Sequence, residues 1–199
     1  NSDVPVTVKM RAGWDDTSVN ARDIALHAQE AGIKALIVHG RTREQGYRGR
    51  VDYNIIREIK EALAIPVIAS GDALSPQLIR KMFDETGCDG VTIARGALGN
   101  PWIFRETVEF LRSGKIIQKP DIYEIVHTII AHLNLCVEYH GETDGVKIFR
   151  KFLVWYTKGF PGIRMLRNEA FRAKTKEEMM DIIGELRTTE ENIICCSGV

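Results

Sequence analysis

The fold is decided by one strand–helix–strand unit at residues 66–94, PVIASGDALSPQLIRKMFDETGCDGVTIA. Two short apolar runs, Pro66–Ser70 and Gly90–Ala94, enclose the segment Ser75–Thr86, which begins with Ser-Pro. A serine cap followed by proline is typical of the start of a helix. Because both apolar runs are almost continuous, they predict strands that are covered on both faces, as in a parallel sheet.

The same unit repeats upstream. Apolar runs at Val4–Met10 and Ala35–His39 predict two more strands, and helical spacing of apolar residues predicts helices at Ser18–Ala31, with a serine cap, and Asp52–Ala64. Repeated strand–helix units of about 30 residues indicate right-handed parallel crossovers. This pattern leaves two architectures open, a doubly wound open sheet and a (β/α) barrel.

Beyond Pro101 the pattern changes to helices without strands. Asp121–His140 carries apolar residues at spacings of three and four, which predicts an amphipathic helix. Gly, Lys and Pro interrupt both patterns between Gly114 and Pro120. The predicted domains are therefore residues 1–117 and residues 118–199.

A basic block lies in the second of these domains. The 27 basic and 27 acidic residues balance over the chain, but Lys147 to Lys176 holds nine basic residues against Glu169 alone, which is +8 and leaves −8 for the rest. Aromatic residues are interleaved with these charges, and most of them are expected in a core. Cations with aromatics are typical of an RNA-facing surface. The candidate RNA contacts in the block are Lys147, Arg150, Lys151, Arg164, Arg167 and Arg172.

The composition also suggests a cellular setting. No apolar run approaches the roughly 18 residues that a membrane span needs, and residues 1–10 lack the pattern of an export signal. The four cysteines show no paired CxxC spacing, which fits a reducing cytoplasm. We therefore expect a cytoplasmic protein that has no membrane partner and no metal site.

Polar residues follow each predicted strand at its carboxyl end. They are Lys9–Arg11, His39–Arg43, Ser70–Asp72 and Ala94–Ala97. Parallel strands bring such ends to one edge of a sheet, so we expect a positive, donor-rich cavity suited to an anion. The glycines of the third and fourth loops allow close backbone approach, and the helix starts that follow are expected to supply free N–H groups to a phosphate.

Four strings in this chain resemble the second half of the tRNA-dihydrouridine synthases, and most closely their bacterial subgroup. They are VTVKMR (6–11), VHGRTR (38–43), IASGD (68–72) and IARGALGNPW (93–102), which match in order and spacing. The resemblance covers about Val4 to Ile183. It implies an α/β fold, the C-terminal half of a (β/α)8 TIM barrel (strands five to eight), followed by a small all-helical domain that binds tRNA.

The activity that the resemblance implies is FMN-dependent reduction of uridine to 5,6-dihydrouridine in tRNA, with NAD(P)H as reductant. Lys9 would lie beside the flavin ring, and the loop after the third strand would wrap the phosphate, although the family more often has asparagine at Ser70. The implied FMN contacts are Lys9, His39, Ser70, Gly71, Asp72, Ala94 and Arg95. The implied contacts to the substrate nucleotide are Arg11, Arg41, Arg43 and Tyr47.

The chain departs from the family pattern at its start. The first four strands are absent, and so is the cysteine after strand four that acts as general acid; none of the four cysteines here matches it. We interpret the chain as part of a longer protein and expect it to show little or no reductase activity alone. A half barrel of four strands would leave two unpaired edges and an uncovered inner face, which would favour self-association.

Two other functions remain open. One is a non-catalytic tRNA-binding fragment. The other is a different FMN-binding TIM-barrel oxidoreductase, such as a dihydroorotate dehydrogenase-like enzyme, since phosphate loops after strands seven and eight are shared among such barrels. The basic block argues against this second alternative, because a small-molecule reductase has no use for it.

Overall fold

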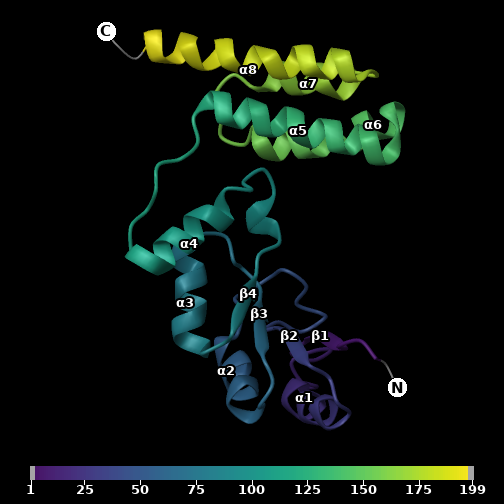
Figure 1. The fold of residues 1–199 in the computed structure, drawn as a ribbon, viewed down its shortest axis with the longest axis vertical. Coiled ribbons are helices and arrows are strands. Elements are labelled where there is room, and N and C mark those ends of the chain that lie inside the picture. The colour runs from purple at the N-terminus through teal and green to yellow at the C-terminus, as the bar shows by residue number, and fades with distance from the viewer. Residues whose placement is uncertain (1–2, 197–199) are drawn as a thin grey trace. The chain divides into compact units, whose positions relative to one another are not determined.

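The structure is a computed structural model that describes residues 3–196, with side chains through Arg187. The described chain forms two compact units (Figure 1). Unit 1 runs to Ala97 and resumes over Ile103–Ile116. Unit 2 comprises the short segment Leu98–Trp102 and the chain from Ile117 onward.

Unit 1 is built on a four-stranded parallel sheet. The strands are β1 (Thr7–Arg11), β2 (Ala35–His39), β3 (Val67–Ser70) and β4 (Gly90–Thr92), in the spatial order β1-β2-β3-β4. The first three strands are followed by α1 (Ala21–Glu30), α2 (Tyr53–Ala62) and α3 (Pro76–Thr86). A short 3-10 turn, η1 (Arg95–Ala97), follows β4, and α4 (Ile103–Ser113) completes the unit. The predicted α/β fold with a parallel sheet is confirmed.

The helices α1, α2 and α3 form one layer on the sheet. Spatial order equals chain order, and right-handed crossovers then place every helix on the same face. In agreement, α1 packs on α2 and α2 packs on α3 (Figure 1). A doubly wound sheet would reverse its strand order to place helices on both faces. The order of the described strands does not have this reversal.

The helices cover one face of the strands, and the opposite face is partly open in the described residues, as expected for the uncovered inner face of a half barrel. Leu36 and Val38, which point toward the helices, are 0% exposed, whereas Ile37 and Ile68 on the opposite face are only half-buried. Successive side chains of a strand point to opposite faces, so one helical layer covers only every second residue. The other face bears Lys9, which is exposed.

Capping residues fix where the helices of unit 1 begin. The Ser75 hydroxyl accepts a hydrogen bond from Leu78 N at 3.3 Å, with Pro76 in the first turn, as the sequence predicted. The serine cap expected at Ser18 is wrong. The hydroxyl of Ser18 instead donates to Asp15 Oδ1 at 2.9 Å in a local turn, and α1 begins three residues later at Ala21.

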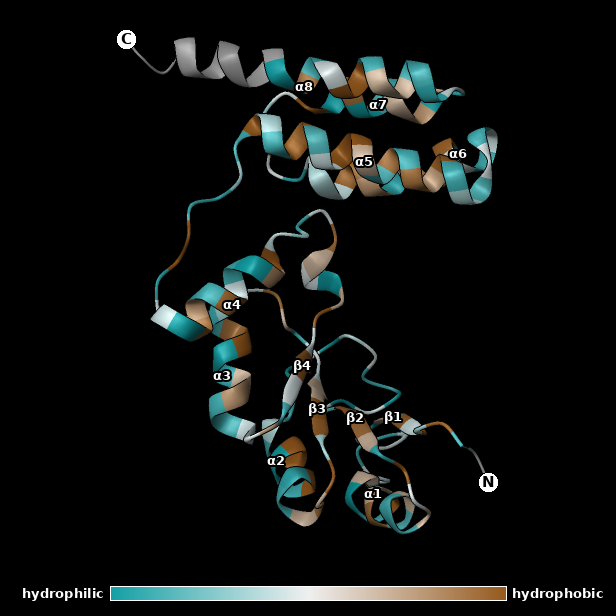
Figure 2. Cartoon of the chain, in the orientation of Figure 1, coloured by the Kyte–Doolittle hydropathy of each residue, from teal (hydrophilic) through white to brown (hydrophobic). Residues whose placement is uncertain are grey.

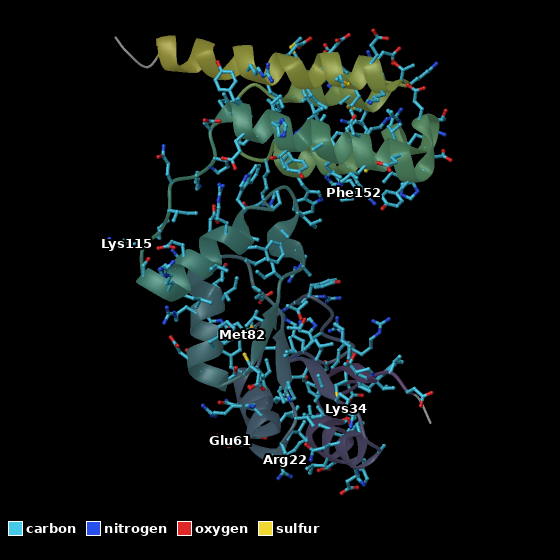
Figure 3. The ribbon with its side chains drawn as sticks, viewed as in Figure 1. Arg22, Lys34, Glu61, Met82, Lys115 and Phe152 are labelled. Carbon is cyan, nitrogen blue, oxygen red and sulfur yellow. The ribbon has the colours of Figure 1, made fainter. Side chains whose placement is uncertain are left out.

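The core of unit 1 lies between the sheet and this helical layer. Apolar residues gather on the strands and on the helix sides that face them (Figure 2). Met82 of α3 is 0% exposed and belongs to this cluster with Ile56 and Ile59 of α2 (Figure 3). This packing holds the strands in register and so fixes where their carboxyl ends lie.

Unit 2 is helical. Its helices are α5 (Ile122–His140), α6 (Glu142–Tyr156), α7 (Arg164–Arg172) and α8 (Lys176–Cys196). The predicted amphipathic helix is confirmed as α5, which packs on α6 and α8 through Val126, Ile129 and Leu133. The carboxylate of Asp121 caps α5 by accepting from Glu124 N at 2.8 Å. Within residues 3–196, no helix is long and apolar enough to cross a membrane.

The segment Leu98–Trp102 joins the helical core although its chain neighbours belong to unit 1. Trp102 packs edge-on against Tyr156, with 6.5 Å between ring centroids, and its Nε1 donates to Glu124 Oε1 at 2.8 Å. Gly99 has φ +69°, and a Cβ there would lie 2.3 Å from the carbonyl carbon of Trp155. Only glycine fits this position.

Candidate functional site

A cavity of about 170 Å³ lies at the carboxyl ends of the strands in unit 1. It is lined by Lys9, Arg11, His39, Tyr47, Ser70, Gly71, Asp72, Ala73, Leu74, Thr92, Ala94 and Arg95. Every residue that the sequence suggested for the cofactor lines this one cavity, and so do Arg11 and Tyr47. The parallel register explains this, because Arg11, His39, Ser70 and Thr92 pair in one row across the sheet.

Sequence reasoning missed three residues of the lining. Thr92 lies two residues before Ala94, so the alternation of side chains along β4 was a usable signal for it. Ala73 and Leu74 follow Asp72 in the loop after β3. Nothing in their residue types distinguishes them from ordinary loop residues.

His39 presents a buried and neutral imidazole to the cavity. The pKa of His39 is lowered to about 4, first by burial and then by the positive charges of Arg11, Arg41 and Lys9, against the opposing effect of Asp72. Its Nε2 is buried and has no hydrogen-bond partner among the described residues. An unpaired buried polar atom is costly, so this nitrogen is well placed to bond a ligand.

Gly71 allows the chain to pass close to that imidazole. Its φ is +119°, and a Cβ at this position would lie 2.7 Å from Cδ2 and 2.8 Å from Nε2 of His39. Side chains other than hydrogen are thus excluded both by the backbone conformation and by the space. The loop after β3 can therefore approach the strand-end row only because residue 71 is glycine.

Asp72 joins two arginines at the edge of the cavity. Its carboxylate accepts from both terminal nitrogens of Arg41, including Nη1 to Oδ1 at 3.0 Å, and from Arg95 Nη2 at 2.8 Å. Burial raises the pKa of Asp72, but the hydrogen bond and charge of Arg41 and the charge of Arg95 outweigh it, so the pKa lies below its ordinary value. Asp72 is thus ionised and holds Arg95 beside the cavity.

The structure places Arg41 differently from the expectation of a nucleotide contact. Arg41 is 2% exposed, and its Nε and Nη2 donate to the carbonyls of Arg48 and Gly49 at 3.0 and 2.7 Å. All three guanidinium nitrogens are therefore engaged inside the protein. Arg41 fastens the loop after β2 to Asp72, a role that residue type and spacing did not reveal.

The other three predicted nucleotide contacts are distributed around the same loop. Arg11 lines the cavity, and its Nη1 donates to the carbonyls of Thr42 and Gly46 at 2.8 and 3.1 Å. Tyr47 is 66% exposed and its ring centroid lies 4.5 Å from Cζ of Arg95, a cation–π contact. Arg43 is exposed but does not line the cavity.

Helix starts contribute less to this site than expected. The long helices begin only at Pro76 and Ile103, after the loops that line the cavity. The amides of Leu74 and Ala97 already donate to the carbonyls of Asp72 and Ala94. Positive side-chain charge for an anion in the cavity comes from Lys9, Arg11 and Arg95.

The candidate RNA contacts of unit 2 fall into two groups. Lys147, Lys151, Arg164 and Arg172 are exposed. Arg150 and Arg167 are only half-exposed, and their guanidinium groups donate inside the helical unit, Arg150 to the carbonyl of Ala173 and Arg167 to Thr157 Oγ1 and the carbonyl of Val154. These two arginines join helices to one another, a structural role that the sequence did not predict.

Comparison with known proteins assigns the family. The model of the dihydrouridine synthase (Dus) family matches residues 1–193. A tRNA-dihydrouridine synthase B from Xanthomonas axonopodis pv. citri is 44% identical and covers 89% of this chain and 53% of its own length. One from Pseudomonas aeruginosa is 40% identical, covering 96% of this chain and 57% of its own length.

A cyanobacterial protein and a solved structure also resemble the chain. A probable tRNA-dihydrouridine synthase 1 from Synechocystis is 41% identical and covers 94% of this chain and 52% of its own length. A solved structure of a mandelate oxidase mutant with benzaldehyde is 14% identical over 87% of this chain and 57% of its own, with a TM-score of 0.31, too low to inform the fold. The chain spans about half the length of the curated relatives that it matches. It belongs to the dihydrouridine synthase family.

Proposed function

We propose that this chain supplies the flavin-phosphate site and an RNA-binding surface to a tRNA-dihydrouridine synthase, which reduces uridine in tRNA with FMN and NAD(P)H. The observation that carries the proposal is the single cavity that gathers all seven predicted cofactor residues. Family membership supports the activity, since the relatives above are named as tRNA-dihydrouridine synthases. A protein that acts on tRNA with NAD(P)H would work in the cytoplasm.

The cavity fits part of a flavin nucleotide. Its volume of about 170 Å³ lies below the roughly 300–1,000 Å³ of sites that enclose a whole ligand, so it suits a phosphate with the adjoining chain. Lys9 and Arg95 supply charge to a phosphate or an anionic flavin, Gly71 removes the obstructing side chain, and His39 Nε2 supplies an unused hydrogen-bonding atom. When bound, FMN would supply the hydride that reduces the uracil ring.

Each protein group has a separate task in this proposal. Lys9 and Arg95 hold negative charge, neutral His39 orients the cofactor through a hydrogen bond, and Asp72 keeps Arg95 in place. Among the residues whose side chains the structure describes, through Arg187, the cysteines are Cys88 and Cys136; both are buried and neither lines the cavity. Protonation of the uracil is therefore assigned to no cysteine of the described residues.

The architecture that goes with this function is a (β/α)8 barrel, of which β1–β4 would be strands five to eight. Two observations support it: the sequential strand order, and the partly exposed face that carries Lys9, Ile37 and Ile68, where a barrel places its interior side chains. The helical unit would be the tRNA-binding domain, through exposed Lys147, Lys151, Arg164 and Arg172. Self-association through the open sheet stays a prediction, tested by sedimentation velocity.

Binding titrations on the 199-residue chain test the proposal. FMN fluorescence is expected to be quenched on binding, with affinity lowered at least about tenfold, or 1.4 kcal/mol, by Lys9→Ala and by Arg95→Ala. Lys34→Ala is the matched control, because Lys34 is an exposed lysine just before β2, at the opposite end of the sheet (Figure 3). Equal FMN affinity in all four proteins would contradict the site.

Binding of an unmodified tRNA transcript tests the second half of the proposal. Combined replacement of Lys151, Arg164 and Arg172 is expected to weaken binding and to reduce its salt dependence, because each lost phosphate contact releases about one counterion fewer. Arg167 is unsuitable for this test, since its loss would disturb the helical unit. A protein that binds tRNA but not FMN would instead favour the non-catalytic RNA-binding alternative.

A further inference from the structure

The loops that follow β1 and β2 are joined into one rim at the carboxyl end of the sheet. Arg43 N donates to the carbonyl of Gly13 and Glu44 N to that of Trp14, both at 2.9 Å. Gln45 Nε2 adds a bond to Asp16 Oδ1 at 3.3 Å. We define this rim as residues 12–20 and 40–52. It borders the cavity, because Arg11 and Tyr47, which line the cavity, adjoin or belong to it.

Trp14 stands on this rim with its side chain 70% exposed. Its backbone is nevertheless held on both sides. The carbonyl is paired to Glu44, and the preceding residue, Gly13, lies so close to the next turn that a Cβ there would be 2.3 Å from the carbonyl oxygen of Ser18. An indole exposed to solvent contributes little to the stability of the fold, yet the backbone that bears it is fixed by these contacts.

The rim carries charges of both signs, with four arginines (Arg41, Arg43, Arg48 and Arg50) and four acids (Asp15, Asp16, Glu44 and Asp52). Arg43, Arg48 and Arg50 are all exposed on the loop after β2. Among the acids of the first loop, Asp15 is engaged with the hydroxyls of Thr17 and Ser18, which lowers its pKa. Tyr47, the second exposed aromatic residue of the rim, already rests against the guanidinium of Arg95. The excess of positive charge lies in the adjoining cavity, which holds Lys9, Arg11 and Arg95 against Asp72. Exposed aromatic side chains beside such cations are the combination that binds unpaired nucleotides.

We propose that Trp14 is a stacking platform for an unpaired base of the RNA substrate, beside the cavity. The inference rests on the proposed function and adds to it a residue outside the cavity lining. Stacking suits this position because every base has a π-face, so one indole can hold a neighbour of the target nucleotide whatever its identity. The ordered backbone at Trp14 reduces the entropy that would be lost when the base is bound.

The test compares Trp14→Ala and Trp14→Phe with the unaltered 199-residue chain, using an unmodified tRNA transcript as the probe. Trp14→Ala is expected to weaken tRNA binding by about 5- to 150-fold, which corresponds to about 1–3 kcal/mol. Trp14→Phe retains an aromatic face and is expected to stay within about threefold of the original affinity. FMN affinity should be unchanged in both variants.

A matched control and a direct signal sharpen this test. Phe104→Ala removes another exposed aromatic side chain of unit 1, 53% exposed on α4, and should leave tRNA affinity unchanged. Addition of tRNA should quench tryptophan emission in the unaltered chain and quench it less in Trp14→Phe. Because the side chain is exposed, Trp14→Ala should unfold at the same temperature as the unaltered chain.

Three results would overturn the role of Trp14. If the unaltered chain binds tRNA and Trp14→Ala binds it equally well, the stacking inference fails while the proposed function stands. If Trp14→Ala changes the sedimentation coefficient or the unfolding temperature instead of tRNA affinity, the indole packs against protein. If the unaltered chain binds no tRNA, the RNA-binding half of the proposed function fails together with it.

Discussion

At the residue scale, Gly71 is a position where the site does not accommodate a side chain. Gly71→Ala is expected to lower FMN affinity at least about tenfold, since the new methyl group would collide with His39, and to cost about 1–3 kcal/mol of stability through strain. Gly87→Ala is the control: Gly87 also has a positive φ, +64°, but open space around it. Gly87→Ala should therefore lower stability but leave FMN affinity unchanged. Flavin titration and thermal unfolding measure the two effects, and unchanged affinity in Gly71→Ala would contradict the fit.

His39 gives a prediction for pH. The unfolded chain takes up a proton near the ordinary pKa of 6.5, whereas burial lowers the pKa of folded His39 to about 4. The contribution of neutral His39 to the free energy of unfolding is therefore fully present above about pH 6.5. It declines as pH falls toward 4, by up to about 1.4 kcal/mol per pH unit. His39→Gln should remove this component. Urea unfolding of both proteins from pH 7 to pH 4 checks the difference, and parallel curves would contradict it.

The sequence predicted the membership of the cavity better than the role of each residue. Lys9, His39 and Arg95 could be found because parallel strands bring their carboxyl ends together whatever the side chains do. Arg41 could not, because its burial depends on where the loop after β2 meets Asp72, which lies 31 residues away. Residue type alone does not separate an arginine that binds substrate from one that anchors a loop.

At the scale of elements, the pairing of Arg41 with Asp72 attaches the loop after β2 to the loop after β3. Arg41→Met is expected to lower stability by about 2–4 kcal/mol, less than a fully buried pair because the Asp72 side chain is 29% exposed. The freed loop should then be cut faster by trypsin after Arg48 and Arg50. Both effects follow from the loss of hydrogen bonds to the carbonyls of Arg48 and Gly49.

The control for this experiment is Arg95→Met. It removes the other partner of Asp72 and the cation–π contact with Tyr47, but leaves the bonds of Arg41 to the loop intact, so tryptic cleavage should accelerate much less than in Arg41→Met. Chemical unfolding and timed proteolysis provide the two measurements. Equal rates of tryptic cleavage in Arg41→Met and the unaltered chain would contradict this role of Arg41. The backbone hydrogen bonds of the rim would then hold the loop without the ion pair.

Elements were predicted reliably where one local signal sufficed. Ser-Pro at Ser75 and the stripe of α5 determine those helices, because capping and amphipathic periodicity act within a few residues. The start of α1 was misplaced because Ser18 has a competing hydrogen bond to Asp15. The apolar runs predicted the strands, but an apolar run does not show which part of a protein covers each face.

At the scale of the whole molecule, the chain passes between the two units more than once. It leaves unit 1 after Ala97, returns at Ile103 and leaves again after Ile116. Glycine, lysine and proline mark the last of these crossings in the sequence. Nothing in the periodicity marks the first two, because the membership of Leu98–Trp102 depends on contacts with residues more than 20 positions away.

Trp102 provides the prediction at this scale. Trp102→Ala is expected to destabilise unit 2 by about 2–4 kcal/mol, through the lost contact with Tyr156 and the lost hydrogen bond to Glu124. Trp102→Phe keeps a ring and should cost about 1 kcal/mol. Hydrogen exchange should accelerate in α5 and α6 while β1–β3 stay protected. Faster hydrogen exchange in β1–β3 instead would contradict the assignment of Trp102 to unit 2.

This five-residue excursion limits how the protein can be divided or recombined. A chimera spliced only near residue 117 would join the helices of one relative to the Leu98–Trp102 segment of another. Trp102 from one relative would then have to pack against Tyr156 and bond to Glu124 from the other. Any residue other than glycine at position 99 would also collide with the backbone of α6. Exchanges between relatives are therefore expected to succeed when the Leu98–Trp102 segment and the helices of unit 2 come from the same relative.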